Sequence, residues 1–103
     1  MEKKEDARMC FETETERVYA LDDDGRLVAE VTFPLDAAGV AEINHTFVDE
    51  SLRGQGVAGR MMETAAAHLR AGGRRVRPVC SYAVRWFASH PEYGDLLAPD
   101  ERI

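Results

Sequence analysis

The sequence predicts an α+β domain in which helices pack on a mostly antiparallel sheet. Polar and apolar residues alternate through much of the first half, which is typical of half-buried strands. From Val57 onward the apolar residues recur at helical spacing instead. A short strand and a second helix then follow, so a meander of strands ends in a strand–helix–strand crossover.

Four strands are expected before the first helix. They cover residues 8–13, 17–21, 26–33 and 40–48. The sequence DDDG at 22–25 is a strong turn signal and joins the second and third strands into a hairpin. Cys10, inside the first of these strands, is expected to serve packing.

Two helices are expected in the second half. The apolar face of the first helix ends before Gly72 and Gly73, because glycine readily adopts the left-handed conformation that closes a helix. A fifth strand covers 75–80. Ser81 is a suitable N-cap for a second helix that runs to about Ser89, before Pro91 prevents its continuation. The first helix is expected to bury Val57, Met61, Met62, Ala65 and Leu69.

Composition limits the classes of partner. The chain has 103 residues and a formal net charge of −6, which argues against nucleic acid because phosphate binding needs a concentrated basic face. No apolar stretch approaches the roughly 20 residues that cross a bilayer, and the charged N-terminus lacks a signal peptide. The two cysteines form no metal or redox spacing, so we expect reduced thiols in a cytoplasmic protein without a metal. One domain is expected over 7–99, with a disordered lead-in at 1–6 and a loose tail at 100–103.

The segment between the fourth strand and the first helix carries the strongest functional signal. It reads Arg53-Gly54-Gln55-Gly56-Val57-Ala58. The first amides of a helix have no internal partner, and the helix dipole adds partial positive charge there. Two glycines remove side chains that would hinder a close approach by phosphate, so the segment predicts an anion site. It lacks the lysine of a nucleotide-hydrolase phosphate loop.

The same segment, together with Val48, resembles the motif V-x-x-x-x-[QR]-x-x-G-x-[GA] of the GNAT superfamily of N-acetyltransferases. Arg53 stands at the Q/R position, Gly56 at the central glycine and Ala58 at the final small residue. The phrases INHT at 43–46, CSY at 80–82 and HPEY at 90–93 are similar to those of the small YjdJ-type members. The resemblance implies a minimal acetyl-CoA N-acyltransferase fold, with acetyl-coenzyme A between splayed fourth and fifth strands. The backbone amides of Arg53, Gly54, Gln55, Gly56, Val57 and Ala58 would then hold the pyrophosphate, and Val48 would pair with the pantetheine arm.

Cys80 is the first catalytic candidate. It ends the fifth strand just before a helix, an environment that generally favours a thiolate. The resemblance would place it near the thioester, where it either contacts the cofactor or accepts the acetyl group; a small buried packing residue is the alternative. The usual tyrosine acid of the family falls on Phe87, which cannot donate a proton. Tyr82 is a weaker substitute, with packing beside the helix start as the alternative, and a thiolate can also leave without an acid.

A base is less clearly indicated. An imidazole titrates near neutral pH and accepts protons well. His45 is therefore a tentative base, although alternation places it with Ile43 and Phe47 on the more apolar strand face, as a core histidine would be. Glu42 is the alternative base.

Two functions remain open at this point. The first is transfer of an acetyl group from acetyl-coenzyme A to an unidentified amine. The second is a non-catalytic coenzyme A-binding sensor or interaction module, which the phenylalanine at the acid position favours.

Overall fold

The computed structural model describes residues 10–101. The expected lead-in at 1–6, the start of the expected first strand at 8–9, and residues 102–103 of the expected tail lie outside the described residues. The strands are β1 (Glu12–Glu14), β2 (Arg17–Leu21), β3 (Leu27–Thr32), β4 (Ala41–Ile43), β5 (His45–Val48) and β6 (Val76–Pro78). The helices are α2 (Val57–Ala71) and α3 (Ser81–Ser89), with 3₁₀ turns η1 (Glu50–Leu52), η2 (Pro91–Leu96) and η3 (Pro99–Glu101).

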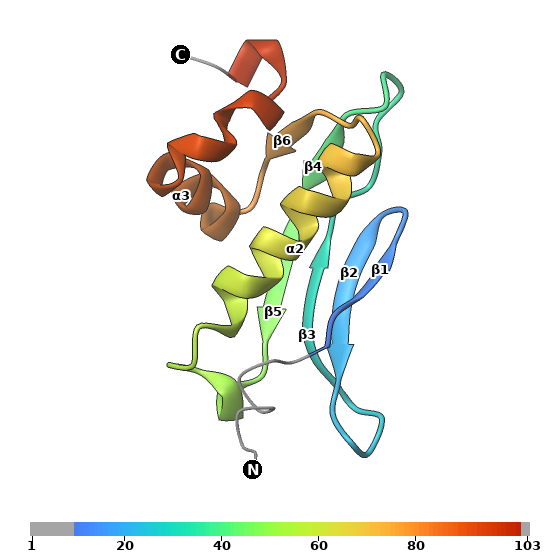
Figure 1. Cartoon of the computed structure of the whole chain (residues 1–103), viewed down its shortest axis with the longest axis vertical. Helices are drawn as coiled ribbons and strands as arrows, with labels where there is room; N and C mark the ends of the chain where they lie inside the picture. Colours follow the sequence, from blue (N-terminus) through green and yellow to red (C-terminus); the bar gives the residue numbers. More distant parts are fainter. Residues whose placement is uncertain (1–9, 102–103) are drawn as a thin grey trace.

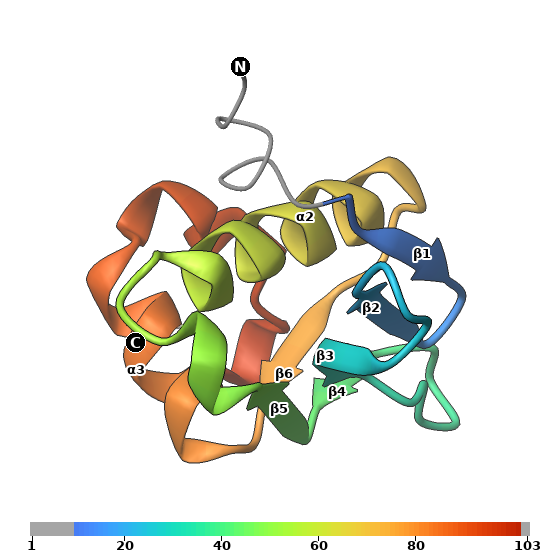
Figure 2. The same cartoon turned by 90° about the horizontal axis from the view of Figure 1, so that it is seen from below.

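The predicted α+β class is confirmed. Four strands form an antiparallel sheet in the order β1-β2-β3-β5, and β4 pairs in parallel with β6. Figure 1 shows α2 running along these strands, with α3, η2 and η3 beside it. Helix α2 contacts β2, β3 and β5. Figure 2 shows the helices gathered on one side of the strands.

The core lies between α2 and the sheet. As predicted, the apolar face of α2 is buried, and it packs on β2 and β3 residues such as Val18, Ala29 and Val31. These side chains are fully shielded from solvent. Their packing fixes the position of α2, and therefore of its first turn, relative to the sheet.

The fourth strand differs from its prediction. A single strand over 40–48 was expected, but Asn44 interrupts it, so that β4 joins β6 and β5 joins β3. The Asn44 amide bonds to Thr32 O at 3.2 Å, although Thr32 already faces His45 in the β3–β5 register. Two residues therefore oppose one, as in a β-bulge, and the in–out alternation reverses at this point.

One smaller expectation is also wrong, because Cys10 is exposed and precedes β1, which begins only at Glu12. In the expected tail, Asp100 lies in η3, and its carboxylate is 2.8 Å from the Arg77 guanidinium.

Candidate functional site

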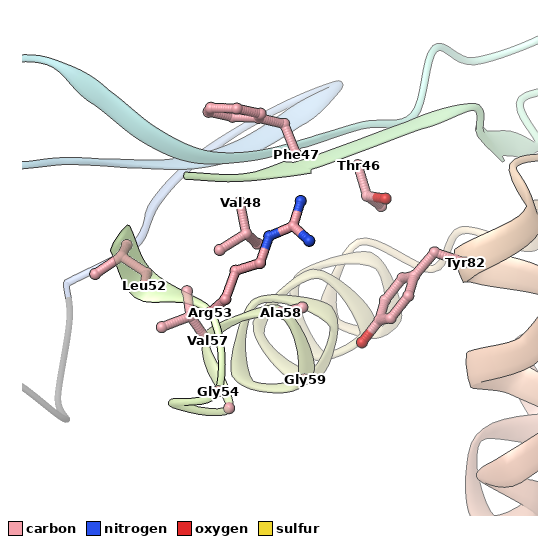
Figure 3. A pocket seen from close by; sticks show the side chains of 11 residues that line it. Thr46, Phe47, Val48, Leu52, Arg53, Gly54, Val57, Ala58, Gly59 and Tyr82 are labelled. Carbon is pink, nitrogen blue, oxygen red and sulfur yellow. The ribbon is translucent and has the colours of Figure 1, made fainter. Parts of the chain in front are cut away.

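A cleft of about 450 Å³ opens between the end of β5, the start of α2 and the start of α3 (Figure 3). It includes most of the segment that the sequence singled out. The lining residues are Thr46, Phe47, Val48, Leu52, Arg53, Gly54, Gly56, Val57, Ala58, Gly59 and Tyr82.

The two glycines of the loop have backbone conformations that only glycine adopts easily. Gly54 has φ of 84° and Gly56 has φ of 74°. A Cβ on Gly54 would meet nothing within 4 Å, so the space beside it is open. The glycines therefore set the path of the loop as well as leaving room for a ligand.

The start of α2 suits an anion. Gly56 is its N-cap and makes no side-chain capping bond, so the first amides of the helix have no side-chain acceptor. The first turn carries no acidic residue. Among the described lining residues Arg53 is the one with a charge, and no carboxylate lines the cleft although the whole chain carries −6. Figure 3 shows the Arg53 side chain directed from the loop toward β5. The dipole of α2 and this guanidinium together favour a negatively charged ligand.

Strand β5 contributes a backbone edge to the other wall. The Asp49 amide bonds to Val28 O at 2.8 Å, and antiparallel ladders alternate between bonded and non-bonded pairs. By this alternation His45 and Phe47 direct their backbone groups to β3, while Thr46 and Val48 direct theirs to the opposite edge. Within residues 10–101 no strand pairs with that edge. An extended ligand could therefore hydrogen-bond along it as an added strand would.

The edge is open because β5 and β6 diverge. The parallel β4–β6 pairing ends at Ile43 and Pro78. Beyond it, Ile43 O accepts from both the Val79 amide at 2.9 Å and the Cys80 amide at 3.0 Å, and the chain then turns into α3. The expected splay between the two strands is thus present in the geometry.

Cys80 lies at the point of divergence. It is the N-cap of α3, and its Sγ accepts from the Ala83 amide at 3.4 Å. Its Sγ is also 4.0 Å from Thr46 Oγ1, and Thr46 lines the cleft. The thiol is partly buried and not bonded to the other cysteine. Its contact with Thr46 places it beside the cleft, although Cys80 does not itself line it.

Tyr82 lines the cleft and does not merely pack beside the helix start. Figure 3 shows its ring across from Ala58 and Gly59. Burial raises the pKa of the Tyr82 phenol above its ordinary value, against a smaller opposing effect of Arg85. The phenol therefore keeps its proton at neutral pH and can donate it. Phe87 is buried, with its ring centroid 5.1 Å from that of Trp86.

The other candidates do not line the cleft. His45 was expected on the apolar face, but the irregularity at Asn44 turns it outward; about half of its side chain is exposed, and its Nε2 lies 3.5 Å from Glu30 Oε1. Glu42 faces Arg77, with 3.9 Å between Oε2 and Nε. The Gln55 side chain donates to Ser51 O at 3.3 Å and stays with the loop.

Sequence reasoning missed several lining residues. Thr46, Leu52 and Gly59 were not singled out, although their neighbours were. Thr46 could have been identified only by knowing that the strand breaks at Asn44, because that break decides which side chains face α2.

Comparison with known proteins identifies the family. The fold combines two diverging strands with a glycine loop at the start of a helix, and the cleft lies between them. The family model described as GCN5-related N-acetyl-transferase matches residues 17–96, and the chain belongs to this family. No significant match is found among curated protein sequences.

Solved structures support the same fold. A GCN5-like protein from Staphylococcus aureus superposes with a TM-score of 0.72 at 24% identity, covering 87% of this chain and 88% of that one. A protein assigned as a phosphinothricin N-acetyltransferase gives 0.57 at 24% identity, over 76% of this chain and 53% of that one. Nourseothricin acetyltransferase gives 0.53 at 22% identity, over 71% and 46%. The chain thus spans about half the length of the last two, whereas it matches the first over most of both chains.

Two other classes of site are absent from the described residues. No helix there is long and apolar enough to cross a membrane. No group of three or more histidine, cysteine or acidic side chains gathers there to hold a metal ion.

Proposed function

We propose that the protein binds acetyl-coenzyme A in this cleft and transfers the acetyl group to a primary amine. The observation that supports it best is the joint opening of three features onto one cleft. These are the glycine loop, the uncapped start of α2 and the unpaired edge of β5. An anionic group would bind at the glycine loop and the start of α2, and an extended arm that contains amides would bind along the edge of β5.

The loop and α2 would hold the pyrophosphate. The amides at Gly54, Gly56, Val57 and Ala58 lie where a phosphate can approach, because neither glycine carries a side chain. Arg53 supplies a full positive charge at the same place. The amide of Gln55 belongs to the same stretch of backbone, although its side chain does not line the cleft.

Val48 and Thr46 would hold the pantetheine arm through the backbone edge of β5. The arm contains two amides, which suit alternate donors and acceptors on a strand edge. Cys80 would then lie near the thioester, since it stands where β5 and β6 part.

The transfer needs little acid–base help from the protein. The amine nitrogen attacks the thioester carbonyl carbon, the C–S bond breaks, the thiolate leaves, and the nitrogen releases one proton to water. Tyr82 is placed to give that thiolate a proton. Because His45 and Glu42 lie outside the cleft, we propose neither as the base, and the amine would enter unprotonated from solution.

Thermal unfolding tests the binding step of the proposal. Acetyl-coenzyme A at about 100 times its dissociation constant should stabilise the fold by about 2.7 kcal/mol. For a domain of this size, that is a rise of about 10–20 degrees in Tm. If millimolar acetyl-coenzyme A does not change the Tm, the proposal is refuted.

A second candidate function is a coenzyme A-binding module without turnover. The burial of Phe87 at the usual acid position favours it. Release of free thiol from acetyl-coenzyme A in the presence of a panel of primary amines distinguishes the two functions. An enzyme releases thiol continuously, whereas a sensor binds and stops.

A further inference from the structure

Arg60 is a partly buried cation that neither the motif nor the cleft lining includes. It lies in the first turn of α2, where a cation opposes the helix dipole. Its Nε and Nη2 are shielded from solvent and have no hydrogen-bond partner. Buried unpaired donors are costly, and such a group is usually retained for a reason other than stability.

The one hydrogen bond of its guanidinium points to that reason. Arg60 Nη1 donates to Gln55 O at 3.0 Å. The Gln55–Gly56 peptide is trans, so its carbonyl and its N–H point in opposite directions. Holding the carbonyl on the Arg60 side therefore directs the Gly56 N–H away from Arg60. Gly56 lines the cleft and Arg60 does not.

We propose that Arg60 is a positioning residue that fixes the Gln55–Gly56 peptide so that the Gly56 N–H can donate to a phosphate oxygen. This inference rests on the proposed function, because the phosphate is that of coenzyme A. The peptide needs such a support, since glycine on one side of it leaves its rotation almost unrestricted. A Cβ on Gly56 would also lie only 3.4 Å from Arg60 Nη1, so glycine permits the contact.

The test compares two ligands on matched variants. Coenzyme A carries the phosphates, whereas S-acetylpantetheine has the same arm without them. Arg60→Met should weaken coenzyme A binding by about tenfold or more, the scale expected of one hydrogen bond to a charged group. It should change S-acetylpantetheine binding by less than about twofold, within the noise of calorimetry. Arg60→Lys, which keeps the charge but not the fork of donors, should recover binding only in part.

Arg70→Met is the control, because it removes the same charge from the far end of α2, where Arg70 pairs with Asp95 on the surface. It should leave both affinities unchanged. The Gly56 amide proton should move downfield on coenzyme A addition in the wild type, and far less in Arg60→Met. The Tm of Arg60→Met should be equal to or above that of the wild type, because two buried unpaired donors are removed.

The outcomes separate the inference from the proposed function. Failure of the wild type to bind coenzyme A would refute the proposed function itself. If the wild type binds coenzyme A and Arg60→Met binds it with the same affinity, the role of Arg60 is refuted while the proposed function stands. The same conclusion follows if Arg60→Met loses affinity for coenzyme A and for S-acetylpantetheine equally. If Arg60→Met does not fold, Arg60→Lys with the Gly56 amide shift decides in the same way.

Discussion

Replacement of Gly54 by alanine tests the phosphate loop against a control of nearly identical backbone geometry. Gly54 has φ of 84° and Gly25, in the β2–β3 hairpin, has φ of 83°. A Cβ at either position meets nothing within 4 Å. The cost of each substitution is therefore the left-handed backbone alone, about 1–2 kcal/mol. At about 4–8 °C per kcal/mol for a domain of this size, both variants should lose a similar amount of Tm.

Their ligand binding should differ. Gly25 does not line the cleft, whereas Gly54 does. Gly54→Ala should weaken coenzyme A binding about tenfold or more, equivalent to about 1.4 kcal/mol, while Gly25→Ala binds as the wild type does. Differential scanning fluorimetry gives the Tm and calorimetry gives the affinity. Equal affinities in the two variants would show that the phosphates do not rest on this loop. Gly56 is a poorer probe, because a new methyl group would also press on Arg60.

Three further predictions concern the thiol, the phenol and acid stability. Cys80→Ser should keep most of the transfer rate, because direct attack by the amine needs no acetylated intermediate. For the same reason, the wild type should form no acetyl adduct when the amine is left out. Rapid acetylation of Cys80, detected by mass spectrometry, would contradict this. Tyr82→Phe should lower kcat while leaving coenzyme A affinity within about twofold, and the wild-type rate should not fall from loss of this proton until above about pH 10, since burial raises the pKa of Tyr82. The amides of Arg26 and Val40 hold the pKa of the Asp22 and Asp36 carboxyls below the ordinary value. Their contribution to stability is thus present above about pH 4 and is lost as pH falls through the lowered pKa values. The double variant Asp22→Asn/Asp36→Asn should show a shallower fall of Tm with acid, and an unchanged slope would refute the assignment.

Local patterns predicted much of the fold. Helix α2 begins at Val57 and ends before Gly72, as its apolar spacing and its glycines indicate. The glycine loop that lines the cleft was singled out from one short segment, since the glycines and the helix start are adjacent in sequence. Both features depend on residues only a few positions apart, which is the range over which sequence patterns are informative.

The break at Asn44 was not predictable in that way. Neither glycine nor proline marks it, and polar–apolar alternation runs through it without a fault. Its cause is non-local: Thr32, on another strand, accepts the Asn44 amide through its carbonyl and donates its hydroxyl to Asn44 Oδ1 at 2.6 Å. Counting across this point placed His45 on the wrong face. Arg60 was missed for a similar reason, because its contact with Gln55 O becomes visible only when the loop has been folded back over the helix.

The unpaired edge of β5 also has a consequence for self-association. A row of open backbone groups is a template on which a second chain can pair, and many proteins cover or shorten such edges to prevent aggregation. This protein cannot cover the edge without closing its own cleft. Its β5 is instead only four residues long, from His45 to Val48, and is bounded by Asn44 and by Asp49, whose carboxylate accepts from the Ser51 amide. A strand that short offers few backbone hydrogen bonds to a second chain, whereas a single extended ligand can use all of them. Occupancy by ligand should therefore protect the protein against aggregation on storage, beyond any gain in thermal stability.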